Sequence, residues 1–127
     1  MAAGTVTVTQ LVNNGIRLFK FEWVSGSAPD TVGEAHATTT FPIYGQALAL
    51  VTTPGTGAAT PTDDYDITVK DSATGLDVLW GAGANRDSVN SEQVAPTSPS
   101  VAYGLLTFTV TAAGSAKAGT AWVYVRG

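Results

Sequence analysis

The chain has 127 residues, a formal net charge of −4, one histidine and no cysteine. Without cysteine, the protein has no disulfide framework, no thiolate zinc site and no cysteine nucleophile. The length fits one domain, so we expect residues 1–127 to fold as a single unit around one core.

Charged residues make up only 13% of the chain, which is about half of the usual share in a soluble domain. The six Lys and Arg residues are scattered from Arg17 to Arg126, so the concentrated basic footprint of a nucleic-acid-binding protein is missing. An anionic membrane surface is disfavoured for the same reason. The neutral polar surface that remains, rich in Thr, Ser, Ala and Gly, suits a protein that packs against other protein.

The sequence also predicts that the protein is made in a cytoplasm and has no membrane partner. It contains no run of about 18 apolar residues, which a membrane-spanning helix needs. Residues 1–5 have no basic segment followed by an apolar stretch, so we expect no cleavable signal peptide. A chain without cysteine does not depend on an oxidising compartment.

The first predicted element is a β-hairpin. Residues 5–9 alternate threonine with valine, and residues 16–24 alternate apolar or aromatic side chains with charged ones. This period of two is typical of strands that are buried on one face. Asn13, Asn14 and Gly15 between them supply the positive φ angles of a tight turn. The aromatic side chains expected to face the core are Phe19, Phe21 and Trp23.

Further strands are expected at 34–41, 45–53, 65–70, 76–80, 101–111 and 120–126, with loops at 25–33, 54–62 and 95–100. In 45–53, Leu48 and Leu50 are expected on one face, opposite Ala47, Ala49 and Val51. Apolar residues on both faces indicate a central, covered strand.

Residues 84–94 are the one stretch with helical character, for one or two turns. The whole pattern predicts an all-β, single-domain antiparallel β-sandwich, Ig-like or jelly-roll, with seven or eight strands and at most one short helix.

Residue patterns that carry catalysis are missing. A serine–histidine–aspartate arrangement would have to use His36, which has no nucleophile motif near it, and we favour a surface position for this residue. The sequence Gly81-Ala82-Gly83 lacks the Lys-Ser/Thr and the βαβ context of a phosphate-binding loop. We therefore expect no catalytic residue, no cofactor and no enzymatic activity.

Acidic residues gather at Asp63, Asp64 and Asp66. Their spacing differs from that of a calcium-binding loop, and aspartates at a loop–strand junction commonly fix turns through the backbone. We favour the turn and expect no metal site, although a weak calcium site remains an alternative if Asp71 or Asp77 lies opposite.

Three aromatic residues are candidates for an interface. Trp80 ends a predicted strand beside glycines, where partial exposure is expected. Trp122 and Tyr124 alternate with Val123 and Val125, so one of these two pairs must face outward. For Trp122 we favour the core, then a protein interface, then a ligand platform, because exposed apolar patches usually mark interfaces.

Residues 65–87, with the sequence YDITVKDSATGLDVLWGAGANRD, follow the lead-in PGTGAATPTDDYD, and the chain closes with AGTAWVYVRG. Together these segments resemble small virion proteins encoded in the structural modules of tailed bacteriophages. The resemblance covers most of the chain and consists of strand and turn residues, so it assigns no site residue.

The resemblance implies a capsid decoration or cement protein, which binds between capsomers, often as a trimer at local three-fold positions, and stiffens the shell. We therefore expect a non-enzymatic structural protein on the capsid surface, with the major capsid protein and copies of itself, as a homotrimer, as partners. A neck, tail or baseplate component is an alternative, and a carbohydrate-binding module is another. Strand addition at a neighbour's sheet edge is expected of the N-terminal residues Thr5, Val6, Thr7 and Val8.

Overall fold

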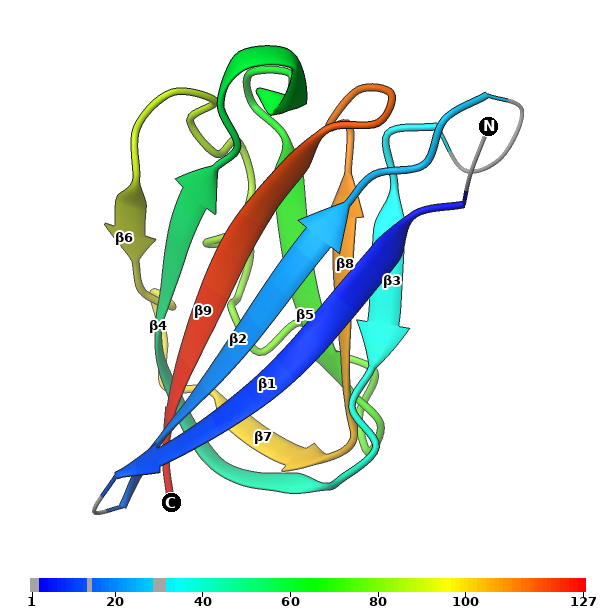
Figure 1. Ribbon diagram of the computed structural model, residues 1–127. Helices are drawn as coiled ribbons and strands as arrows, with labels where there is room; N and C mark the ends of the chain where they lie inside the picture. The colour runs from blue at the N-terminus through cyan, green and yellow to red at the C-terminus, as the bar shows by residue number, and fades with distance from the viewer. Residues whose placement is uncertain (1–2, 14, 29–31) are drawn as a thin grey trace.

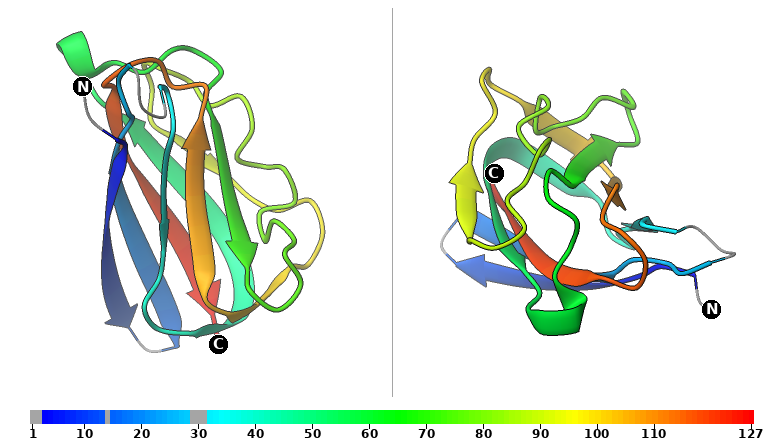
Figure 2. Two further views of the ribbon diagram at one scale, coloured as in Figure 1. Left: turned by 90° about the vertical axis from the view of Figure 1, so that its right-hand side faces the viewer. Right: turned by 90° about the horizontal axis from the view of Figure 1, so that it is seen from above.

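Two antiparallel sheets pack face to face in the computed structural model, which describes residues 3–13, 15–28 and 32–127 (Figures 1 and 2). The strands are β1 Thr5–Asn13, β2 Ile16–Val24, β3 Ala35–Thr38, β4 Ile43–Pro54, β5 Asp66–Asp71, β6 Glu92–Val94, β7 Val101–Gly104, β8 Leu106–Thr111 and β9 Ala118–Arg126, and a 3-10 turn, η1, spans Gly57–Ala59. The expected all-β antiparallel sandwich is confirmed, with nine strands in the described part of the chain. No helix among the described residues is long and apolar enough to cross a membrane.

The larger sheet has the strand order β1-β2-β9-β4-β6, and β7 pairs with the other end of β4. The smaller sheet has the order β3-β8-β5. Figure 1 views the molecule onto the outer face of the larger sheet, with the smaller sheet behind it.

The first two strands form the predicted hairpin. Their register runs from Thr5 opposite Val24 to Asn13 opposite Ile16, and Gly15 has a φ of 88°, a conformation that glycine adopts without steric cost. Asn14, the other expected turn residue, lies outside the described residues.

The core lies between the two sheets, and β2 contributes three aromatic residues to it. Phe19, Phe21 and Trp23 are buried, as predicted. Phe21 stacks on Phe108 of β8 with ring centroids 4.5 Å apart, and Trp23 packs against Tyr65 at 5.5 Å. Aromatic pairs of this kind hold the two layers together, because each ring buries a large apolar area and its geometry is specific.

A β-bulge in β4 corrects the predicted facing of its side chains. The register against β9 shifts between Ala47 and Ala49, so two consecutive residues oppose one and the alternation changes phase. As a result Ala47 and Leu50 both belong to the core, whereas Leu48 lies on the outer face with Ala49. The assignment of Leu48 and Leu50 to one face was therefore wrong.

The predicted strand 101–111 is two strands that belong to different sheets. It breaks at Gly104, which has a φ of 106° and where an added Cβ would lie 2.5 Å from Ser72 Oγ. Ser72 donates its backbone N–H to Leu105 O at 2.9 Å and accepts the Leu105 N–H on Oγ at 3.0 Å. The break lets β7 join the larger sheet and β8 the smaller one, and β8 directs Leu106, Phe108 and Val110 into the core as expected.

Two other expectations about elements were wrong. Residues 76–80 form turns with one isolated bridge, between Asp77 and Lys70, because the Asp77 carboxylate accepts backbone N–H groups that a strand would use in a ladder. Residues 84–94 are not helical, and their last three residues form β6. There the Asp87 carboxylate accepts the N–H groups of Val89 and Asn90 at 2.7 and 3.2 Å, which makes a turn that competes with a helix.

Candidate protein-binding face

The outer faces of the two sheets differ in chemistry. On the smaller sheet, His36, Thr109 and Thr68 lie side by side in one row across β3, β8 and β5. The next row contains Thr38 and Thr107, whose hydroxyl oxygens are 2.8 Å apart. This face is therefore polar, as expected for a surface in contact with water. The surface position expected for His36 is what the structure shows.

The outer face of the larger sheet is apolar over much of its width. One row places Leu11, Leu18, Tyr124 and Ala49 side by side across β1, β2, β9 and β4. The next row brings Trp122 beside Val51. We call this surface the apolar face, and its members are Leu11, Ile16, Leu18, Leu48, Ala49, Val51, Trp122 and Tyr124.

The apolar face is partly open to solvent and carries a shallow hollow. Leu11 is 50% exposed and Ile16 is 40% exposed. The hollow has a volume of about 390 Å³ and is lined by Ile16, Leu48, Ala49, Gln93 and Tyr124. The bulge in β4 supplies part of this lining, because it turns two consecutive side chains, Leu48 and Ala49, to the same side.

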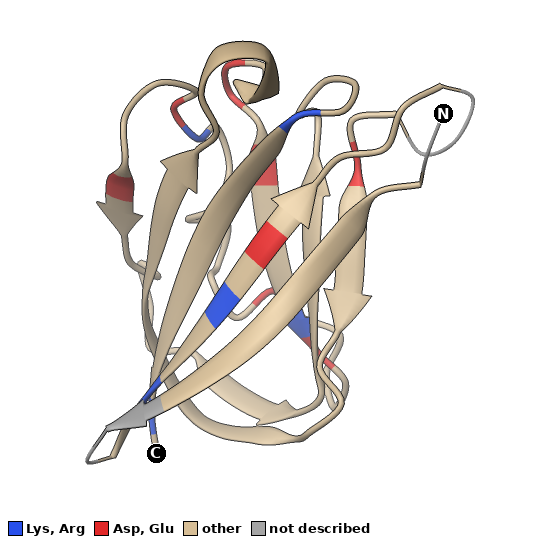
Figure 3. Ribbon diagram, viewed as in Figure 1, with Lys and Arg blue, Asp and Glu red and all other residues tan. Residues whose placement is uncertain are grey.

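Few charges interrupt this face (Figure 3). On β2, Lys20 and Glu22 point outward and their charged atoms lie 3.7 Å apart. Arg126 lies at the lower end, opposite Gln46. Both side chains are still partly hydrated, so a partner that covers the leucine and tyrosine side chains must leave this ion pair in water or meet it with polar groups.

The structure places the predicted interface residues in two environments. Thr5 and Thr7 are exposed on the outer side of β1, whereas Val6 and Val8 pack partly against the core. Tyr124 lies on the apolar face.

Trp122 also lies on the apolar face, and the favoured assignment of this residue to the core was wrong. The register decides the matter, because Val123 and Val125 pair with Phe19 and Arg17 of β2, and both valines are fully buried.

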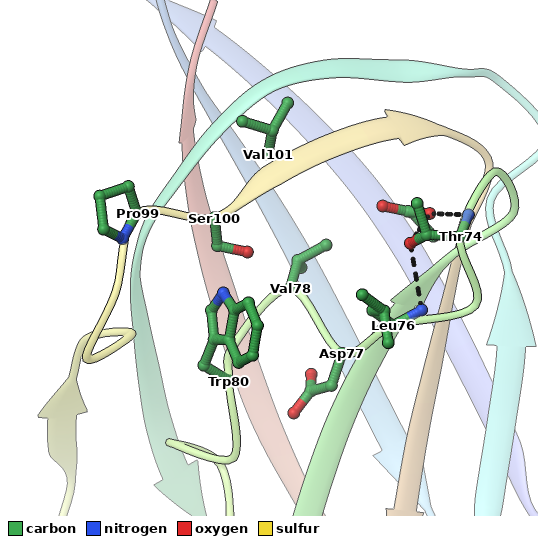
Figure 4. Close-up of a pocket in the computed structure, with 9 residues that line it drawn as sticks. Thr74, Leu76, Asp77, Val78, Trp80, Pro99, Ser100 and Val101 are labelled. Atoms are coloured by element: carbon green, nitrogen blue, oxygen red, sulfur yellow. Dashed lines mark hydrogen bonds between the residues drawn. The ribbon is translucent and has the colours of Figure 1, made fainter.

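Trp80 lies away from the apolar face, at a smaller hollow of about 130 Å³ (Figure 4). Its indole is 52% exposed, which agrees with the predicted exposure. The backbone there has a φ of 52°. Figure 4 shows Leu76 and Trp80, from the segment after β5, and Val101 of β7 around this hollow.

The acidic residues of the Trp80 hollow bind the protein's own backbone. Asp77 accepts the N–H groups of Val69 and Leu79 on Oδ1, at 3.0 and 3.1 Å, and that of Gly81 on Oδ2, at 3.0 Å. Asp71 Oδ1 accepts both the N–H and the hydroxyl of Thr74, at 2.7 and 2.8 Å. These carboxylates fix the loop.

The acidic group at 63–66 likewise shapes the chain. Asp63 Oδ1 accepts the Ser88 N–H at 3.2 Å, and Asp66 Oδ1 accepts the Asn85 N–H at 2.9 Å. Among the described residues, no group of three or more His, Asp or Glu side chains is placed to hold a metal ion.

Sequence reasoning missed several exposed apolar residues. Tyr44 and Tyr103 form an edge-to-face pair with centroids 4.8 Å apart, and both are half exposed. Leu48 was missed because no residue pattern announces a bulge, and Ile16 and Leu18 because their strand was judged by its central charges. Ile16 and Leu18 lie on the same face of β2 as Lys20 and Glu22. Apolar residues on the charged face of a strand are the signal that sequence reasoning could have used.

No protein-family model matches the chain, and no curated protein matches it.

Proposed function

We propose that the protein is a non-enzymatic structural component of a tailed-bacteriophage virion, and that it decorates or cements the capsid shell. The observation that carries this proposal is the contrast between the polar outer face of the smaller sheet and the apolar face of the larger one. A sandwich with one apolar outer face is built to bury that face, and exposed patches of this kind mark interaction surfaces.

The composition of the apolar face suits a protein partner. Tyrosine and tryptophan at its centre, with threonines such as Thr53 and Thr120 at its margin, have the arrangement of an interface core and its polar rim. The resemblance of residues 65–87 to phage virion proteins supports the major capsid protein as the partner. In this arrangement the polar face of the smaller sheet points to solvent, away from the shell.

The test of this proposal is binding to capsid shells. We would assemble expanded shells from the major capsid protein encoded nearest to this chain's gene and measure co-sedimentation. The wild-type protein is expected to bind. Tyr124→Lys should weaken binding roughly 30-fold, because truncating or charging a central aromatic residue of an interface costs about 2 kcal/mol.

The matched control is Thr68→Lys, which places the same charge on the outer face of the smaller sheet. It should bind like the wild type. A wild-type protein that does not sediment with the shells, or a Tyr124→Lys variant that binds as well as Thr68→Lys, contradicts the proposal.

A neck, tail or baseplate position would use the same face against a different partner. Copy number separates the two positions. Hundreds of copies per particle by quantitative mass spectrometry support the shell, whereas six or twelve support the neck.

A carbohydrate-binding module is the second candidate, and the exposed indole of Trp80 favours it. Aromatic rings stack on sugars, but a sugar site also needs convergent polar groups, and Asp71 and Asp77 are held by their own loop. Glycan-array binding that disappears in Trp80→Ala would support this function, and a blank array would end it.

A further inference from the structure

Among the described residues, the outer edge of β1 has no neighbouring strand. β1 is the terminal strand of the larger sheet, and in this part of the chain it pairs only with β2. Its nine residues, TVTVTQLVN, include no charged residue and no proline. Natural edge strands are usually short or carry lysine, proline or a bulge, which prevents pairing with another chain.

The other terminal strands in the described part of the chain are protected in these ways. β6 has three residues, and β3 and β7 have four each. β5 has six residues, among them Lys70 and two aspartates. The length and neutrality of β1 are therefore specific to one edge of the molecule.

The edge is also accessible in the plane of the sheet. β3 is the element of the smaller sheet that comes closest to β1, and its first residue, Ala35, lies beneath the start of β1. The position of Gly4 shows this, because an added Cβ there, on the inward side shared with Val6 and Val8, would overlap Glu34 O and the Cα of Ala35. A further strand can therefore lie beside β1.

The first five residues of β1 form a palindrome. Residues 5–9 read Thr-Val-Thr-Val-Thr in both directions about Thr7. An antiparallel copy centred on Thr7 places Thr5 opposite Thr9 and Val6 opposite Val8. Threonines then meet threonines on the outer side and valines meet valines on the inner side, and both are favourable cross-strand pairs.

We propose that two copies of this chain associate by antiparallel pairing of their β1 strands, in a register centred on Thr7. The partner is a second copy because the edge is complementary to itself in chemistry and in register. A two-fold pairing of identical strands closes on itself and yields a dimer. It differs from the three-fold arrangement that the resemblance implies, and it does not depend on the proposed capsid function.

The pairing also accounts for the partial exposure of Val6 and Val8. Both pack against the core but remain partly exposed at the edge. In the dimer each would meet a valine of the other copy, so their exposed surfaces would be covered. The outward backbone groups of β1 would gain the hydrogen bonds of a ladder.

Cysteine cross-linking tests the register, because the chain has no cysteine of its own. Thr7→Cys should form a disulfide-linked dimer under mild oxidation, since directly opposed residues lie about 4.5–5.5 Å apart between Cα atoms, within the range of a disulfide. Thr5→Cys alone and Thr9→Cys alone should cross-link weakly, because in this register the two copies of the same position are roughly 14 Å apart. A mixture of the two variants should cross-link efficiently, because Thr5 of one copy lies opposite Thr9 of the other.

The outcome is read on a non-reducing gel, with the exposed loop variant Thr62→Cys as the control for random collision. Cross-linking of Thr7→Cys at least ten-fold above that control supports the proposal. Equal cross-linking of Thr7→Cys and Thr62→Cys, or self-linking of Thr5→Cys that exceeds that of Thr7→Cys, overturns it.

A charge placed at the centre of the register tests the association without a cross-linking reaction. In Thr7→Lys two lysines would meet across the two-fold axis, and sedimentation equilibrium should show at least a ten-fold weaker dimer. Thr120→Lys is the matched control, because Thr7 and Thr120 flank the same Glu22, on β1 and on β9.

These two variants also distinguish the edge from the apolar face. Weakening by Thr7→Lys alone supports pairing through β1. Equal weakening by Thr120→Lys indicates association through the face of the sheet and overturns the proposal, as does a wild-type protein that is monomeric at the highest soluble concentration. None of these results bears on shell binding, which Tyr124→Lys tests separately.

Discussion

At the scale of single residues, three polar atoms in the core stand out. Trp23 Nε1, Thr52 Oγ1 and Tyr65 Oη are buried and have no hydrogen-bond partner among the described protein atoms. Thr52 lies close enough to favour the ionised form of Tyr65 slightly, but their geometry falls short of a hydrogen bond. The phenol therefore loses hydration on folding and regains little.

Tyr65→Phe removes this hydroxyl while keeping the ring that packs on Trp23. Burying an unpaired hydroxyl costs roughly 1–3 kcal/mol, so the variant should be as stable as the wild type or up to about 1 kcal/mol more stable in urea denaturation. A loss above about 1 kcal/mol would show that the hydroxyl is well satisfied. Phe21→Leu, which damages the same core without removing a polar atom, provides the comparison.

The pH dependence of stability gives a second test of Tyr65. Desolvation by burial raises the pKa of its phenol above the ordinary value of 10.0. Above about pH 10 the unfolded chain then releases this proton more readily than the folded protein, so stability falls as pH rises. The wild type should lose stability more steeply than Tyr65→Phe between pH 10 and about pH 11, and parallel curves would contradict the shift.

At the scale of elements, the Asp77 carboxylate makes the largest set of side-chain hydrogen bonds to backbone N–H groups in the segment after β5. Asp77 receives three backbone N–H groups, and the two residues after it, Val78 and Leu79, are buried in the core. Asp77 thus fixes a turn whose apolar residues complete the sandwich.

Asp77→Ala should destabilise the protein by about 2–3 kcal/mol, since each lost hydrogen bond contributes about 1 kcal/mol. Asp63→Ala, which removes a single exposed contact to Ser88, should cost less than about 1 kcal/mol. Chemical denaturation of both variants measures the difference. Equal losses would mean that Asp77 has no special role.

The elements also show what sequence reasoning can predict. Strand positions and most inward faces follow from alternation, because burial on one face requires a period of two. The bulge at Ala47–Ala49, the switch of sheets at Gly104 and the turn at Asp77 escaped prediction, because they depend on contacts between residues far apart in the chain. The apolar face was only half predicted for this reason, since Leu48 owes its outward position to the bulge.

At the scale of the whole molecule, the outer face of the larger sheet is apolar, whereas that of the smaller sheet is polar. The sequence favoured Trp122 for the core, and the register against β2 places Val123 there instead. Trp122 lies outside the core, beside Val51 and on the same face as Tyr124. This position is stronger evidence for a partner than the tryptophan content of the sequence alone. The identity of that partner is not encoded in any local pattern.

The position of β9 has a consequence for how the protein is made. β9 follows all other strands in the chain, yet it lies in the middle of the larger sheet, between β2 and β4. During translation the hairpin of β1 and β2 can form early, but the edges of β2 and β4 that face β9 stay unpaired until residues 118–126 leave the ribosome. Folding dominated by such distant pairings takes milliseconds to seconds, so the nascent chain carries exposed β-edges throughout its synthesis.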